Sequence, residues 1–270
     1  MSGNYDLTEF HNRLCLLMTE IHKICVENNI NYTLLGGSLI GALRHKGFIP
    51  WDDDIDIGMT YDNYKKFVEV AFSLNHEWLE FDLAGKTIFY YPFIKAYDNR
   101  TTFLEDMRKD AKGIFVDIFP ISYAGNTFED AYKEFRKHRY YQSILKRKSY
   151  RFATGYMKEF LLHMIAKLYS VPYLMKVITS HYEELNLSKK CFSSDMDGTK
   201  KGIVPSDIFD SYKMYEFEGY EFMGVVDADK YMRLVFGDYM KLPPIDQRVP
   251  HHIDYLNLEL PYKDYNSQKE

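Results

Sequence analysis

The run Asp52-Asp53-Asp54-Ile55-Asp56-Ile57 decides the fold, together with Leu34-Leu35-Gly36-Gly37-Ser38 a short way upstream. Side chains on a β-strand alternate between its two faces. The pattern therefore predicts a strand over 52–58, with Asp52, Asp54 and Asp56 on one face and the isoleucines packed on the other. An acidic loop in solvent has no reason to alternate with isoleucine, so the alternation favours a strand with one buried face.

Three carboxylates on one face repel each other unless a divalent cation neutralises them. Mg²⁺ is the expected ion, with Mn²⁺ as the alternative, because Mg²⁺ takes hard oxygen ligands and keeps room for water and substrate phosphates. The turn at Gly36, Gly37 and Ser38 would present backbone N–H groups at a helix start, which suits a phosphate. The two runs together predict a metal–phosphate site.

The composition is that of a globular protein and excludes some functions. The chain has 270 residues and a net charge of −5, so we expect no nucleic-acid partner. Three cysteines without metal-ligand spacing suggest a reducing cytoplasm. Neither a signal peptide nor a membrane-spanning run is predicted. Aromatic residues make up 17% of the chain, which suits a carbohydrate- or membrane-facing surface but equally a compositional habit of the source.

The order of predicted elements indicates an α+β core with a mixed sheet and flanking helices. Helices are expected at 8–28, 39–44 and 61–74, and strands at 32–35, 52–58, 80–83, 87–91, 93–97 and 114–118. We therefore expect residues 1–125 to form the catalytic core. Residues 191–270 would complete the core and the active site.

Residues 126–190 are expected to form a helical subdomain. Its first part is rich in Lys and Arg, and the apolar stretch 160–169 follows. A basic helix beside an apolar amphipathic one suits an anionic membrane surface, which predicts peripheral contact through 133–169 at the inner face of the membrane. The alternative is that the apolar face of these helices simply packs on the core.

Asp54 and Asp56, with Asp117 on a second hydrophobic strand, form a ligand set for one or two metal ions. Asp117 would bind metal or accept the proton of an attacking hydroxyl. The alternative for Asp117 is a buried carboxylate that caps nearby N–H groups.

Several cationic side chains are candidate phosphate ligands. Arg44 and Lys46 lie between the glycine turn and the acidic strand, although they would also suit a solvated turn. Lys95 lies in an apolar strand and needs an anionic partner, either a phosphate or one of the aspartates. His251 and His252 would act as acid, base or phosphate contact, or be structural. The chain contains no Walker A, GxSxG, HExxH or GxGxxG motif.

The run from Leu34 to Met59 closely resembles the signature of the LicD family. The resemblance continues through Val116-Asp117-Ile118-Phe119-Pro120, Phe217-Glu218-Gly219 and Phe236-Gly237-Asp238-Tyr239-Met240-Lys241-Leu242-Pro243-Pro244, and ends at Arg248 with His251-His252. It spans most of the chain. The helical middle, 126–190, carries no motif of the family.

The resemblance implies a nucleotidyltransferase-like fold, in a superfamily that includes the fukutin-like proteins. Members transfer phosphocholine, or a related phospho-alcohol, from a CDP-activated donor such as CDP-choline. The acceptor is a sugar hydroxyl of a bacterial surface glycan, such as teichoic acid, lipopolysaccharide or capsule, and is expected here to be lipid-linked. CMP leaves. The superfamily's Gly-Ser turn corresponds to Gly37-Ser38, its acidic pair to Asp54 and Asp56, and its third carboxylate to Asp117.

Two other functions stay open at the level of sequence. The same fold would also suit a nucleotidyltransferase that adds NMP to a small molecule or protein. A non-catalytic protein that binds glycan or membrane is the third possibility, against which the intact acidic set argues.

Overall fold

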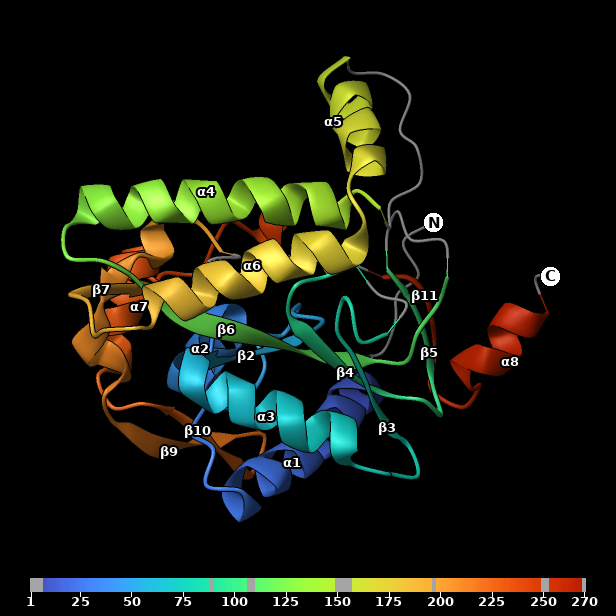
Figure 1. The fold of residues 1–270 in the computed structure, drawn as a ribbon. Helices are drawn as coiled ribbons and strands as arrows, with labels where there is room; N and C mark the ends of the chain where they lie inside the picture. Colours follow the sequence, from blue (N-terminus) through green and yellow to red (C-terminus); the bar gives the residue numbers. More distant parts are fainter. Residues whose placement is uncertain are drawn as a thin grey trace.

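The structure is a computed structural model that describes residues 7–87, 90–105, 110–148, 157–195, 198–248 and 253–268. Its centre is a mixed sheet with strand order β1-β2-β6-β4-β3, which β7 and β8 extend along β6 (Figure 1). The strands of this sheet are β1 (Thr33–Leu34), β2 (Ile55–Thr60), β3 (Leu79–Asp82), β4 (Ile94–Asp98), β6 (Phe115–Gly125), β7 (Phe192–Ser194) and β8 (Val204–Pro205). The α+β class with a mixed sheet, expected from the sequence, is confirmed.

β6 is the longest strand and organises the sheet. Its first half pairs in parallel with β2 and antiparallel with β4, and its second half pairs with β7. The sequence predicts only 114–118 as strand, because Pro120 interrupts the pattern and proline lacks a ladder donor. In the structure the strand continues through Pro120, whose Cα partner is Met59.

Helices cover the sheet through apolar stripes that the sequence pattern predicts. In Figure 1, α4 (Phe128–Lys146) and α6 (Val171–Leu185) lie above the sheet, and α1 (Leu7–Glu27), α2 (Gly36–His45) and α3 (Tyr61–Ser73) lie below it. The buried residues of α1 include Leu14, Leu17, Met18 and Ile21, which recur at helical spacing. The expected helices over 8–28 and 61–74 are therefore confirmed.

The helical character of 126–190 is confirmed in α4, α6 and α5 (Met157–Leu168). α5 projects from the end of α4 and α6, away from the sheet (Figure 1). Within the part of the chain that the structure describes, no helix is both long and apolar enough to cross a membrane. The division of the chain at residues 125 and 190 remains a prediction.

The last part of the chain returns to the core. The hairpin of β9 (Tyr212–Phe217) and β10 (Tyr220–Val225) lies against β1, where Val225 N–H donates to Thr33 Oγ1. The remaining elements are η1 (Lys200–Gly202), η2 (Ser206–Phe209), α7 (Ala228–Phe236), η3 (Ile245–Gln247), β5 (Thr102–Glu105) paired with β11 (Ile253–Asn257), and α8 (Tyr262–Ser267).

Three details of the predicted elements are wrong. Asp52, Asp53 and Asp54 precede β2 instead of lying in it, and Asp52 N–H donates to Ile49 O in a turn. Asp52 and Asp54 thus do not share a strand face with Asp56. No strand spans the described residues of 87–91, where Thr87 makes only an isolated bridge with Ala84. The short helix predicted at 39–44 begins earlier, at Gly36.

Candidate active site

Carboxylates gather where β2 begins. Asp52, Asp53 and Asp54 each offer an oxygen, and these oxygens lie within 4.8 Å of one another. Asp56 follows on β2, and its Cα partner on β6 is Asp117. Paired residues of neighbouring strands project on the same face, so Asp56 and Asp117 stand side by side. Asp53 is a member that the alternating pattern missed, because in a strand it would point the other way.

The site concentrates negative charge in a largely buried place. Burial raises the pKa of Asp56 well above its usual value, and the charges of Asp54, Asp117 and Asp52 raise it further. Burial also raises the pKa of Asp117, to about 6, while the nearby Lys95 ammonium limits the rise. Burial and mutual repulsion disfavour the charged form of these carboxylates, and a bound cation would stabilise that form.

These residues fit a divalent cation. The oxygens of Asp52, Asp53 and Asp54 are close enough to share one ion, and hard carboxylate oxygens are what Mg²⁺ and Mn²⁺ take. Asp117 Oδ1 is buried and already has one cationic partner, because Lys95 Nζ lies 3.0 Å from it.

The glycine turn brings the start of α2 against these carboxylates. Gly36 has φ +47°, a conformation that disfavours other residues, and a Cβ there would lie 3.7 Å from Asp56 Oδ2. A Cβ on Gly37 would overlap the Asp52 carboxylate. Ser38 Oγ accepts the Asp56 N–H at 2.9 Å. Gly37 therefore lets Asp52 approach the positive end of a helix, where a carboxylate is favoured.

Lys95 finds its anionic partners inside the protein. Its side chain is 2% exposed, and Nζ lies 3.0 Å from Asp117 Oδ1 and 3.3 Å from Glu105 Oε1. Lys95 also stands opposite Asp117 in the β4–β6 pairing. The expectation that Lys95 needs an anion is met by an aspartate and by Glu105, which the sequence analysis did not single out. Lys95 thus steadies Asp117 from the side facing away from β2.

Arg44 and Arg248, two further basic candidates, lie near each other. Arg44 Nη1 donates to Tyr239 O at 2.6 Å, and burial, then the nearby Arg248, lowers the pKa of Arg44. Arg248 stacks over Trp51, with 5.4 Å from its guanidinium carbon to the ring centre. Arg44 and Arg248 therefore form a basic pair next to the acidic turn.

Lys46 instead forms an exposed ion pair with Glu216 of β9, at 2.9 Å. The structure thus gives Lys46 a protein partner. His251 and His252 lie outside the described residues.

Two residues far away in the sequence hold the acidic turn, and the sequence analysis missed both as site residues. His11 Nε2 lies 2.8 Å from Asp52 O, and the His11 ring stacks on Phe48 with 3.9 Å between ring centres. Glu218 Oε1 accepts the Phe48 N–H at 3.0 Å. His11 sits in the buried stripe pattern of α1 and carries no local signal, so sequence reasoning had no means to find it.

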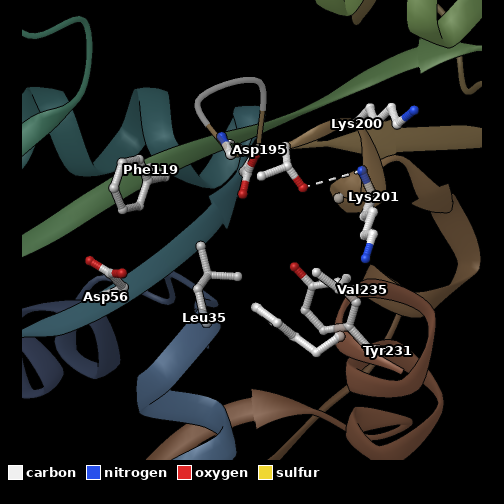
Figure 2. A pocket seen from close by; sticks show the side chains of 13 residues that line it. Leu35, Asp56, Phe119, Asp195, Lys200, Lys201, Tyr231 and Val235 are labelled. Carbon is white, nitrogen blue, oxygen red and sulfur yellow. Dashed lines mark hydrogen bonds between the residues drawn. The ribbon is translucent and has the colours of Figure 1, made fainter. Parts of the chain in front are cut away.

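A pocket of about 560 Å³ opens beside Asp56. Leu35, Gly36 and Asp56 line one side, and Tyr231 and Val235 of α7 line another. In Figure 2, Asp56 and Lys201 stand on opposite sides of this space. Among the candidate site carboxylates, the pocket reaches Asp56.

Comparison with known proteins shows the family of this chain. The family model described as LicD/FKTN/FKRP, nucleotidyltransferase domain, matches residues 29–159. The protein named "Lipopolysaccharide cholinephosphotransferase LicD" of Haemophilus influenzae is 33% identical over 254 residues, which cover 89% of this chain and 94% of that protein. The proteins named "Ribitol 5-phosphate transferase FKRP" of mouse and human are 50% identical over 34 residues, 13% of this chain and 7% of theirs. The chain therefore belongs to the LicD family of phosphotransferases.

Proposed function

We propose that this protein transfers phosphocholine, or a related phospho-alcohol, from a CDP-activated donor to a sugar hydroxyl of a bacterial surface glycan. The glycan would be a lipopolysaccharide, a teichoic acid or a capsule. The similarity to a lipopolysaccharide cholinephosphotransferase along 94% of that relative's length supports choline as the first donor to test. The short match to ribitol 5-phosphate transferases supports testing CDP-ribitol as a second donor.

The observation that carries the proposal is the set of carboxylates at the start of β2, beside the pocket. The family and this acidic set both indicate a divalent metal. We propose Mg²⁺, held by Asp54, Asp56 and Asp117 with Asp52 or Asp53 added. When bound, it would neutralise charge on the donor's phosphates.

The reaction forms a bond from the sugar oxygen to the phosphorus that carries choline. The bond from that phosphorus to the oxygen bridging the two phosphates breaks, and CMP leaves. The proton of the sugar hydroxyl needs an acceptor, and a carboxylate with a pKa of about 6 is suited to this role at neutral pH. Asp117, held in place by Lys95, either binds the metal or accepts this proton, because a carboxylate bound to the metal no longer serves as a base. Arg44 and Arg248 would stabilise phosphate charge.

A donor panel tests this proposal. CDP-choline, CDP-ribitol and CDP-glycerol are each offered with Mg²⁺ and an acceptor glycan, and both CMP and the modified glycan are measured. We expect one of the donors to give CMP and modified glycan in equal amounts. NMP transfer from a nucleoside triphosphate, with no product from any CDP-alcohol, would favour the nucleotidyltransferase alternative. No product with any donor would favour a binding role.

We also propose peripheral contact of the 133–169 segment with an anionic membrane that carries a lipid-linked acceptor. α5 projects from the body (Figure 1), and Leu161, Met164 and Leu168 on it are exposed. Changing Lys146, Arg147 and Lys148 to Gln should weaken binding to vesicles that contain anionic lipid. Neutralising three exposed lysines elsewhere, Lys213, Lys230 and Lys241, is the matched control. Equal vesicle binding by both triple variants and the wild type would argue against membrane contact.

A further inference from the structure

The pocket beside Asp56 has a second charged wall that the sequence analysis did not single out. The strip Gly198–Gly202 lines it, opposite the carboxylates, and includes Lys200 and Lys201. In Figure 2, Lys201 extends along this side toward Tyr231 and Val235, while Lys200 lies at the rim and points outward. Lys201 thus borders the space that leads to Asp56, and Lys200 stands at its rim.

Lys200 and Lys201 are both exposed, and neither forms an ion pair with another of the described residues. Asp195, the acid that also lines the pocket, accepts the Gly198 N–H at 2.9 Å. Asp56 on the far wall belongs to the proposed metal site. The lysine charges therefore remain for an anionic ligand.

The strip that carries the lysines is a preformed turn. Gly202 N–H donates to Thr199 O at 2.8 Å, and Lys201 N–H donates to Thr199 Oγ1 at 3.3 Å. A Cβ on Gly198 would press on the Asp195 carboxylate, so glycine lets the turn close there. Because this backbone is already ordered, binding an anion costs no additional entropy for ordering the turn.

The rest of the pocket is mostly apolar. Leu35, Phe119, Tyr231, Val235 and Phe236 line it between the acidic and basic walls. A nucleoside diphosphate carries groups that suit each of these surfaces. Its base suits apolar and aromatic side chains, and one phosphate lies toward the metal side. The negative charge left over needs a cation on the opposite wall.

We propose that Lys200 and Lys201 form the basic wall of the binding site for the diphosphate of a nucleoside diphosphate. This inference deepens the proposed function and rests on it, because it places the nucleotide part of the activated donor in this pocket. The two lysines counter phosphate charge that the carboxylate-bound metal does not reach.

Binding of CDP tests the site without turnover. The variant Lys200→Ala/Lys201→Ala is compared with the wild type in Mg²⁺ by titration calorimetry, with CDP and with inorganic pyrophosphate. Losing a charge-assisted contact should weaken CDP binding by about tenfold or more. Lys200→Arg/Lys201→Arg should keep most of the affinity. The control Lys66→Ala/Lys176→Ala removes two exposed lysines outside the pocket and should bind as the wild type does.

The outcomes separate this inference from the proposed function. Wild-type binding of CDP that the Ala pair leaves unchanged would overturn the lysine wall and leave the CDP donor standing. Pyrophosphate binding that depends on the lysines, without CDP binding, would support the anion site and contradict a CDP donor. Absence of binding for both probes would overturn both proposals. Unchanged thermal melting of the Ala pair confirms that the comparison is between folded proteins.

Discussion

At the scale of single residues, burial and charge act together on Asp56 and Asp117 in the proposed metal site. Burial raises the pKa of both carboxyls, for Asp117 to about 6. A carboxyl with a raised folded pKa stabilises the metal-free protein at low pH, and this contribution is lost as pH rises through the folded value. A bound metal ion would restore this contribution to the free energy of unfolding, because it takes the place of the protons on the carboxylates.

We therefore expect stabilisation by Mg²⁺ to depend on pH. A hundredfold excess of metal over its dissociation constant should raise the melting temperature by about 5 °C at pH 7.5. The rise should be much smaller at about pH 5, where protons compete for Asp117 and Asp56. Scanning calorimetry at both values checks this, with Asp62→Asn as an exposed control. A metal-induced rise of the same size at both pH values would contradict the metal site.

His11 is a positioning residue for the acidic turn. Burial lowers the pKa of His11, so the ring is neutral and its Nε2–H donates to Asp52 O. His11→Ala should weaken metal binding about tenfold, because groups that orient ligands contribute on this scale. His11→Gln keeps a donor and should restore part of the affinity.

Calorimetric titration with Mg²⁺ measures both His11 variants. His22→Gln is the control, since His22 also lies on α1 but hydrogen-bonds Tyr32 away from the turn. If the His11 and His22 variants lose stability alike and bind metal alike, His11 has only a structural role.

At the scale of elements, the start of α2 decides how close the carboxylates come to the helix. Gly37→Ala places a Cβ against the Asp52 carboxylate and should push the acidic turn away. We expect this variant to lose metal affinity by about tenfold or more while it stays folded. Gly85→Ala is the matched control. It adds a Cβ at φ +82°, 3.4 Å from Met175 Cγ and away from the acidic turn, and should cost only about 1–2 kcal/mol of backbone strain.

Titration of both glycine variants with Mg²⁺ is the measurement. Equal metal affinity in Gly37→Ala and wild type would show that the turn at 52–54 does not need its close approach to α2.

Among the elements, the helices and strands with a regular apolar pattern are predictable from the sequence, and the acidic turn is not. The buried stripes of α1 and α3 and the apolar strands β4 and β6 were predictable, because periodicity reports burial directly. The acidic turn was not, because Asp52, Asp53 and Asp54 depend on the turn at Ile49 and on contacts from His11 and Glu218. Those contacts span 41 and 170 residues of chain. Local alternation therefore gave Asp56 correctly and misplaced Asp52 and Asp54.

At the scale of the whole molecule, the active site is assembled from distant parts of the chain. β2 and β6 supply Asp56 and Asp117, the C-terminal hairpin holds the turn through Glu218, and the strip with Lys201 closes the pocket. This arrangement explains why a motif confined to 34–59 does not suffice to describe the site. It also predicts that substitutions in the hairpin at Glu218 weaken metal binding although Glu218 lies outside the acidic run.

The measurement that tests the central claim most directly is CMP release from CDP-choline. It is made with Mg²⁺, with and without EDTA, in the wild type and in Asp54→Ala. We expect release by the wild type that stops with EDTA and falls by at least about a hundredfold in Asp54→Ala, because a lost contact to a developing charge has effects of this order. Release that persists in EDTA, or that Asp54→Ala leaves unchanged, would contradict a carboxylate-held metal as the centre of this active site.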